Sequence, residues 1–175
     1  MTWTKVFLVI CCLLTNTLTI FGQYSFEQIS KEQGLSHNQV ECILKDSKGF
    51  MWFGTRNGLC RFDGYTIKTY RNSADPHSIS GNRILSIAED KDGYMWVGTY
   101  QNGVDRFDPT TNKFTNFGSD VYIGDQVYAI KILKDSTICF GTSNGLILYS
   151  RRDSFEYYTP YNTNNEMNSY LVSDI

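Results

Sequence analysis

Residues 46–55 read DSKGFMWFGT and residues 90–99 read DKDGYMWVGT, so one ten-residue pattern occurs twice in the chain. A worn third copy starts at Asp135, has a shortened turn, and continues as ICFGT over residues 138–142. An apolar residue precedes each copy and recurs once more near the end of the chain. These residues are Val40, Ile84, Val127 and Val172. Their recurrence every 43 to 45 positions is the signature of a repeat architecture.

Each repeat also contains two turn signals. In the first two copies the aspartate and the glycine, as in Asp46 and Gly49, occupy the first and fourth places of a type I turn. An Asn-Gly pair follows each Gly-Thr, at residues 57–58, 102–103 and 144–145. Such a pair between apolar runs favours a hairpin because both residues tolerate a positive φ. The segments between turns have the length of ordinary strands, so each repeat predicts four short antiparallel strands.

Four strands in a repeat of this length are typical of a β-propeller blade. The sequence therefore predicts an all-β fold of three four-stranded antiparallel blades and the start of a fourth, an incomplete propeller. We expect Trp52 and Trp96 to wedge between neighbouring blades, and the glycine after each to let the backbones approach closely. A solenoid is the competing architecture, although its repeats are usually shorter or helical. The repeated structural motif comprises Trp52, Gly54, Thr55, Asn57, Gly58, Trp96, Gly98, Thr99, Asn102, Gly103, Gly141, Thr142, Asn144 and Gly145.

The repeat boundaries divide the chain into six segments. We assign residues 1–22 to a signal peptide, 23–34 to an N-terminal closing strand and lead-in, 35–79 to blade 1, 80–122 to blade 2, 123–167 to blade 3 and 168–175 to the first strand of a truncated blade 4. Three blades would leave two flat faces and an unpaired edge exposed. We therefore expect a fragment or a truncated reading frame.

The first segment has the composition of an export signal. Lys5 is its only charge, an apolar run follows over residues 6–14, and Gly22 offers a small residue for cleavage before Gln23. The run is too short for a membrane-spanning helix, which needs about 20 apolar residues. We expect a cleaved signal peptide, with an uncleaved anchor as the alternative.

Three cysteines follow this segment, namely Cys42, Cys60 and Cys139. An odd number in an exported chain excludes complete internal pairing. Their spacings offer no metal site, because there is no C-x-x-C and no nearby pair of histidines. All three fall in predicted strands, so we expect them to be small buried apolar side chains.

Composition argues against two classes of protein. Hydrophobic residues make up 41% of the chain, and 16 Lys and Arg stand against 18 Asp and Glu. The hydrophobic fraction is too high for a disordered tail. No basic cluster is present to neutralise the phosphates of a nucleic acid, so we expect no nucleic-acid partner.

The sequence offers little for catalysis. Its two histidines, His37 and His77, are far apart, and no G-x-S-x-G nucleophile motif occurs. Residues 90–93 (DKDG) resemble half of a calcium loop, but the further ligands are missing and the segment aligns with the turn at residues 46–49. We expect no catalytic residue, no metal and no cofactor in this chain.

The repeats resemble a known family. Residues 34–65 contain FMWFGTRNGL and RFDG, and they are similar to the opening blade of the two-component regulator propellers. Residues 70–80 resemble the connector between the first two blades of that family, and the resemblance covers about residues 24–175. It implies the periplasmic sensor region of a Bacteroidetes-type hybrid two-component histidine kinase, truncated before its kinase domains.

The same resemblance implies a set of partners. The ligand would be a small molecule, an oligosaccharide from polysaccharide breakdown. The remaining propeller blades and a second copy, in a homodimer, would be the protein partners. The membrane would be reached only through the missing C-terminal part. Within this chain, Arg56, Tyr100 and Gln101 differ between otherwise matching hairpins, which makes them candidate ligand-binding residues. The competing interpretation is that they are ordinary variable turn residues.

Two other functions stay open at this point. An exported propeller enzyme of the streptogramin-lyase or glycosidase type shares the Gly-x-x-Trp-x-Gly-Thr rhythm. However, the chain lacks the histidine and acidic constellation of a lyase, and both tryptophan repeats break the sialidase box. A structural propeller scaffold is the third possibility, although the Gly-His and Trp-Asp dipeptides of WD-type propellers are absent. Metal-dependent turnover would favour the enzyme.

Overall fold

The computed structural model describes residues 25–118, 126–150, 154–164, 167 and 171–175. The predicted signal peptide lies outside these residues. Within them, the chain forms three separate four-stranded antiparallel sheets and almost no helix, which confirms the predicted all-β fold. No helix in this part of the chain is long and apolar enough to cross a membrane.

Each sheet is a meander whose strands follow one another in space as they do in sequence. Blade 1 contains β1 (Val40–Lys45), β2 (Met51–Thr55), β3 (Gly58–Phe62) and β4 (Ile67–Tyr70). Blade 2 contains β5 (Ile84–Glu89), β6 (Met95–Thr99), β7 (Val104–Asp108) and β8 (Lys113–Asn116). Blade 3 contains β9 (Val127–Ile132), β10 (Ile138–Thr142), β11 (Gly145–Ser150) and β12 (Ser154–Tyr158).

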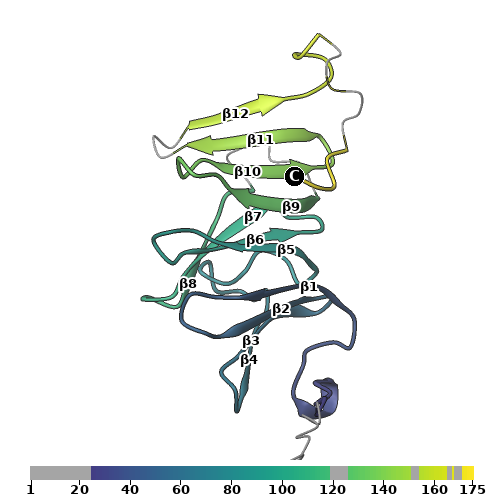
Figure 1. Cartoon of the computed structure of the whole chain (residues 1–175), viewed down its shortest axis with the longest axis vertical. Helices are drawn as coiled ribbons and strands as arrows, with labels where there is room; N and C mark the ends of the chain where they lie inside the picture. The colour runs from purple at the N-terminus through teal and green to yellow at the C-terminus, as the bar shows by residue number, and fades with distance from the viewer. Residues whose placement is uncertain (1–24, 119–125, 151–153, 165–166, 168–170) are drawn as a thin grey trace, which may run out of the picture.

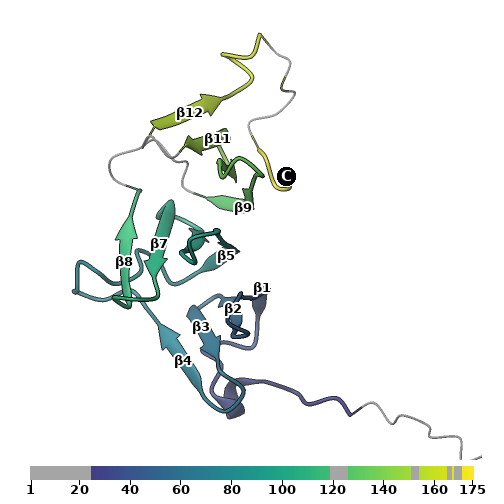
Figure 2. The same ribbon diagram turned by 60° about the vertical axis from the view of Figure 1, so that its left-hand side comes forward.

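The three blades stack along the long axis of the molecule and do not close into a ring (Figure 1). The first strands lie innermost, because β1 contacts β5 and β5 contacts β9, whereas β4, β8 and β12 lie at the opposite edges of their sheets (Figure 2). Each innermost strand has a β-bulge at the same repeat position, formed by Glu41, Leu85 and Tyr128. A bulge bends a strand and increases its twist. The repeated sequence therefore produces the same backbone in each blade, and this includes the bulge.

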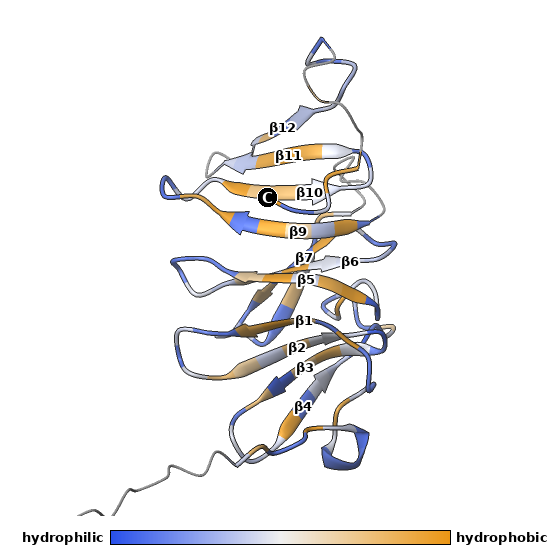
Figure 3. Cartoon of the chain, turned by 45° about the vertical axis from the view of Figure 1, so that its right-hand side comes forward, coloured by the Kyte–Doolittle hydropathy of each residue, from blue (hydrophilic) through white to orange (hydrophobic). Residues whose placement is uncertain are grey.

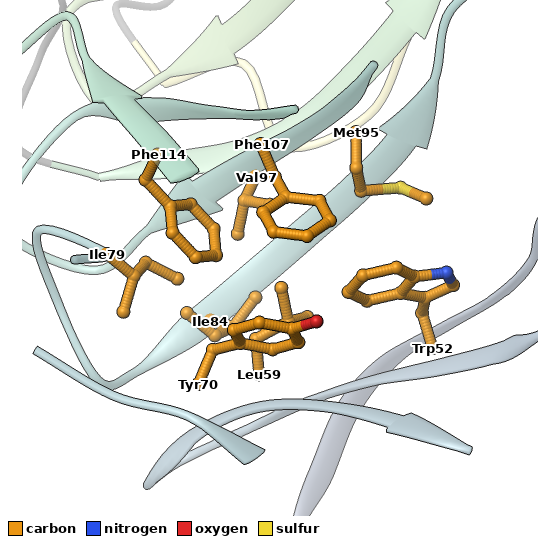
Figure 4. Close-up of a cluster of buried hydrophobic side chains, with 9 residues drawn as sticks. All are labelled: Trp52, Leu59, Tyr70, Ile79, Ile84, Met95, Val97, Phe107 and Phe114. Carbon is orange, nitrogen blue, oxygen red and sulfur yellow. The ribbon is translucent and has the colours of Figure 1, made fainter. Parts of the chain in front are cut away.

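Apolar strand segments alternate with hydrophilic turns (Figure 3), and the apolar side chains fill the gaps between blades. In the first gap, Trp52 stacks on Tyr70 with ring centroids 5.9 Å apart, and Phe107 of blade 2 meets Trp52 edge-on (Figure 4). In the second gap, Trp96 contacts Phe140 of blade 3. Each tryptophan is only 2% exposed, so both wedge between blades as predicted. Truncating such a residue to alanine costs about 3–5 kcal/mol.

The glycine of each Gly-Thr pair lies against the start of the next blade. A Cβ on Gly54 would come within 2.8 Å of Ile84 Cγ2, and one on Gly98 within 2.7 Å of the Val127 carbonyl oxygen. These distances are well below van der Waals contact, so only glycine fits without a shift. The predicted close approach of backbones is confirmed at Gly98, where the neighbouring atom is a backbone oxygen, whereas at Gly54 the atom of the next blade belongs to the Ile84 side chain.

The third blade repeats this contact with the end of the chain. A Cβ on Gly141 would lie 2.6 Å from the Val172 carbonyl oxygen, and the Val172 N–H donates to the Thr142 carbonyl oxygen at 3.0 Å. Val172 therefore takes the place that Ile84 and Val127 take in their interfaces. The described residues 171–175 nevertheless form no strand, although one was predicted over residues 168–175.

The predicted N-terminal closing strand is also not formed. Within residues 23–34 the described part, from Ser25 on, contains only the 3₁₀ helix η1 (Lys31–Gln33), which Ser30 caps. Instead, Leu35 and Ile29 pack on the outward face of blade 1 with Phe53 and Cys60.

The turn after β9 differs from its prediction. In blades 1 and 2 the turn runs from an aspartate N–H to the carbonyl oxygen four residues later, Asp46 to Phe50 and Asp90 to Tyr94. In blade 3 the same bond runs from Leu133 to Thr137, so the turn has full length and Leu133, not Asp135, takes the aspartate position. The shortened turn is therefore a misalignment of a worn repeat.

The three cysteines are free thiols. Cys60 and Cys139 are buried as predicted, and Cys42 is half-buried in the bulged strand of blade 1. Burial raises the pKa of the Cys42 thiol to about 12. This thiol is consequently protonated at neutral pH and a poor nucleophile.

Candidate binding face

The β2–β3, β6–β7 and β10–β11 hairpins lie at one end of their blades, and we call this end the hairpin face. Each hairpin is sealed by its threonine: Thr55 Oγ1 donates to the Gly58 carbonyl oxygen at 2.8 Å and accepts the Asn57 N–H at 3.0 Å. Thr99 and Thr142 make the same pair of bonds in blades 2 and 3. The predicted Gly-Thr and Asn-Gly motifs therefore close all three hairpins with the same two bonds, although the β6–β7 hairpin is one residue longer than the others.

The hairpin face carries a charged and aromatic cluster between blades 1 and 2. Glu41, the bulge residue of β1, accepts from Arg56 Nε at 3.0 Å and from Arg83 Nη2 at 3.3 Å. The Arg83 guanidinium lies over the Tyr100 ring, 4.3 Å from its centroid. Arg83 Nε is buried and has no hydrogen-bond partner among the described residues. The cluster thus holds two cations against one anion, with an aromatic ring beside them.

A polar hollow lies next to this cluster. Its volume is about 510 Å³, and it is lined by the connector over residues 72–80, the tip of the β6–β7 hairpin with Gln101, and the end of β8. The Gln101 and Asn102 side chains are exposed, and neither forms a hydrogen bond to another described residue. Amides and hydroxyls dominate this lining, which suits hydrogen bonding to a polar ligand.

Behind the hollow, one buried carboxylate ties the connector to blade 2. Asp105 of β7 is fully buried and accepts from the Ser80 N–H, from Ser80 Oγ at 2.7 Å and from Asn116 Nδ2 at 3.1 Å. Burial raises the pKa of Asp105 to about 6, although the bonds from Ser80 and Asn116 lower it in part. Ser80 and Asn116 also line the hollow, so the charge of Asp105 is coupled to its walls.

The structure brings two of the three predicted binding residues together. Arg56 and Tyr100 belong to the same cluster through Glu41 and Arg83, while Gln101 lies in the hollow. All three are on the hairpin face, and their role in binding stays a prediction. Sequence reasoning missed Glu41 and Arg83, although each adjoins the repeated apolar residue that opens its blade.

The opposite end of the blades carries the turns that follow β1, β5 and β9 (Figure 3), and we call it the turn rim. There, Asp46 Oδ1 accepts the Lys48 and Phe50 N–H groups and Asp46 Oδ2 accepts Trp52 Nε1–H at 2.8 Å. Asp90 binds Trp96 Nε1–H in the same way at 2.9 Å. We call this aspartate–tryptophan hydrogen bond the clamp. The spacing of the two residues, six positions in both repeats, was the signal in the sequence that could have predicted it.

A cation stacks beside each tryptophan at the turn rim. The Arg61 guanidinium lies 4.8 Å from the centroid of Phe50 and 5.8 Å from that of Trp52. Arg106 lies 4.8 Å from Tyr94 and 5.7 Å from Trp96. Neither arginine takes part in an ion pair within the described residues. In the same part of the chain, no group of three histidine, cysteine or acidic side chains is arranged to hold a metal ion.

Three four-stranded meanders stacked around their first strands define the class of protein: these are β-propeller blades. Comparison with known families then gives the particular kind of repeat. Residues 34–57 and 78–101 each match the two component regulator propeller family. These two segments of the chain are therefore similar to two-component regulator propeller repeats, as the sequence indicated.

Individual proteins are similar to the chain over part of their own length. Histidine kinase P4 of Formosa agariphila is 41% identical over 54 residues, which are 31% of this chain and only 4% of that protein. The extracellular domain of a putative hybrid two-component system from B. thetaiotaomicron has the same fold, with a TM-score of 0.70, 24% identity and coverage of 87% of this chain and 23% of that one.

An enzyme also shares the fold. A catalytically inactive virginiamycin B lyase from Staphylococcus aureus, with quinupristin, superposes with a TM-score of 0.57 and 17% identity over 81% of this chain and 46% of the lyase. At such identities the likeness shows the propeller fold alone.

Proposed function

We propose that this chain belongs to the ligand-sensing propeller of a two-component signal-transduction protein, exported to the periplasm, and that its ligand is an oligosaccharide from polysaccharide breakdown. The observation that carries the proposal is the pair of family repeats at residues 34–57 and 78–101. The match to a histidine kinase and the fold of an extracellular sensor domain support it. Phosphotransfer would then belong to other parts of the full-length protein.

The hairpin face supplies the chemistry for such a ligand. The amides of Gln101 and Asn102 can each donate and accept hydrogen bonds to hydroxyl groups. The blades meet through packed aromatic side chains, so a ligand that spans two of them would favour one packing over another. Such a population shift, passed on as a rigid-body movement, is how a binding event reaches a distant output domain.

The experiment has two stages. The genomic locus is first sequenced through the Ile175 codon, with further propeller repeats, a membrane helix and a kinase domain expected in the same frame. The complete protein is then titrated calorimetrically with a panel of neutral oligosaccharides. A saturable heat with one member, lost in Gln101→Ala with Asn102→Ala, is the expected result. A genuine stop codon after Ile175 with no downstream kinase would overturn the proposal.

The enzyme alternative is tested on the same protein. Incubation with quinupristin and Mg²⁺, followed by mass spectrometry, should return the unchanged compound. Cleavage would assign the chain to the lyases instead. Saccharide titration and the lyase assay thus separate the two classes of function, whatever the identity of the sensed ligand.

A further inference from the structure

The three Asn-Gly pairs at the tips of the hairpins are chemically labile as well as structural. Asparagine is among the thermolabile residues. When glycine follows it, the glycine nitrogen can attack the side-chain amide carbon, because glycine has no Cβ to hinder the approach. Asn57, Asn102 and Asn144 are all exposed, so exposure does not distinguish the three pairs. The surroundings of the glycine nitrogen do distinguish them.

In blades 1 and 3 the glycine of the pair is part of the sheet. Gly58 is the first residue of β3 and pairs with Thr55, and Gly145 is the first residue of β11 and pairs with Thr142. The Gly58 N–H also donates to the Asn82 carbonyl oxygen at 2.6 Å. A nitrogen held in this way reacts only after the strand end has opened locally.

The outer strands pack against the same two glycines. A Cβ on Gly58 would lie 2.7 Å from the Tyr70 carbonyl oxygen, and a Cβ on Gly145 would clash in the same way with the carbonyl oxygen of Tyr158. The attack requires the peptide group between asparagine and glycine to turn. The neighbouring backbone therefore restricts this movement in blades 1 and 3.

The glycine of blade 2 lies outside the sheet. The β6–β7 hairpin has three residues between Thr99 and Gly103, where the other two hairpins have two, and β7 begins only at Val104. The Gly103 carbonyl oxygen accepts from the N–H and from Oγ1 of Thr99. Its own N–H, however, donates to no residue that the structure describes. The extra residue of this hairpin thus leaves the nitrogen of Gly103 unbonded.

We infer that Asn102 is a site of spontaneous deamidation. The Gly103 nitrogen loses its proton to a base of the solvent and attacks Cγ of Asn102. A C–N bond forms, ammonia leaves with a proton from the solvent, and a succinimide ring results. Water then opens the ring at either carbonyl and leaves aspartate or isoaspartate. Asn102 and Gly103 both line the polar hollow of about 510 Å³, a space in which water has polar partners.

The modification would change the character of the hollow without any enzyme. The amide of Asn102 donates and accepts hydrogen bonds, whereas a carboxylate only accepts them. The lining already includes Asp75, so a second negative charge would join the first. Isoaspartate would in addition lengthen the main chain of the hairpin tip by one methylene group. This chemistry is independent of the ligand that the protein senses.

Peptide mapping tests the inference directly. The full chain is kept in mildly alkaline buffer, sampled over time and digested with trypsin at mildly acidic pH for mass spectrometry. The three pairs fall on three separate tryptic peptides, so one incubation yields three rates. Asn102 should convert at least about tenfold faster than Asn57 and Asn144, whose glycines must first leave the sheet. In concentrated urea, which removes the hairpins, the three rates should converge.

Two matched variants isolate the role of hairpin length. Deletion of Gln101 shortens the blade 2 hairpin to the length of the others and should slow Asn102 at least about tenfold. Insertion of a glutamine after Arg56 lengthens the blade 1 hairpin and should accelerate Asn57. Circular dichroism verifies that each variant is folded.

Two results would overturn the inference. One is a native protein in which Asn57 or Asn144 converts as fast as Asn102. The other is a folded Gln101 deletion that leaves the rate at Asn102 unchanged. If the deletion variant does not fold, the insertion after Arg56 decides in its place, and an unchanged rate at Asn57 counts against the role of the ladder.

Discussion

In blades 1 and 2 an aspartate of the turn accepts a hydrogen bond from a buried tryptophan, whereas blade 3 has the same strand pairing without either residue. Asp46 and Asp90 each bind a buried indole N–H, but Leu133 and Cys139 hold the corresponding positions in blade 3. The strand registers of all three blades nevertheless match. The hairpins sealed by threonine, common to all three, are therefore enough to define a blade, and the clamp adds stability to two of them.

The largest loss of stability is expected at the interface glycines, which all three blades share. Gly98→Val should destabilise the protein by more than about 4 kcal/mol, because even a Cβ would lie 2.2 Å from Ser86 Oγ and 2.7 Å from a backbone oxygen. Urea unfolding followed by fluorescence measures the change. Gly49→Ala, where a Cβ meets nothing within 4 Å and only the positive φ is strained, is the control and should cost about 1 kcal/mol.

A pH effect should single out blade 2. Asp105 stands where blade 1 has Cys60 and blade 3 has Ile147. Its pKa, raised to about 6 by burial, exceeds the ordinary 3.8, so the folded state binds this proton more tightly. The contribution to stability is present below about pH 4 and is lost as pH rises to about 6, a loss of roughly 3 kcal/mol.

Urea unfolding of the wild type and of Asp105→Asn from pH 4 to pH 7 checks this sign. The variant should show a flatter profile over that range. Exposed carboxylates have the opposite effect. Hydrogen bonds from backbone N–H groups lower the pKa of Asp63 and of Asp108, so their contribution to the stability of the fold is lost only as the pH falls below the ordinary pKa of an aspartate. An equal slope in both proteins would assign the effect to a different group.

The aspartate of the clamp can be removed from blade 1 and introduced at the equivalent position of blade 3. Asp46→Ala should cost about 2 kcal/mol, because it leaves the buried Trp52 N–H and two turn N–H groups without their acceptor. Leu133→Asp should change stability by less than about 0.5 kcal/mol, since Cys139 supplies no indole. Thermal unfolding compares the two. A clear gain from Leu133→Asp would show that the aspartate acts through the turn alone.

The smallest effect is expected at the hairpin face. Glu41→Gln weakens the exposed pairs with Arg56 and Arg83 and should cost less than about 0.5 kcal/mol, with little left in high salt. Unfolding at two salt concentrations makes the measurement. A cost above 1 kcal/mol would mean that the cluster supports the fold as well as any ligand.

The repeats made most of the fold predictable. Asn-Gly pairs locate the hairpins because turn chemistry depends on a few neighbouring residues. The recurring valine or isoleucine locates the start of each blade. The errors arose where local signals are absent: the divergent turn at Leu133, and segments 23–34 and 168–175, whose strands require partners from other blades. Arg56 and Tyr100 were visible as variable positions, but their link runs through Glu41 and Arg83, which only folding brings together.

The glycines at the blade interfaces have a consequence for ring size. Gly54 and Gly98 each fix how near the first strand of the next blade can come, and Gly141 lies equally close to the segment that contains Val172. Equal contacts repeated in succession impose equal angular steps about a common axis. The glycines at the blade interfaces therefore constrain the number of blades that a closed ring of such repeats would contain.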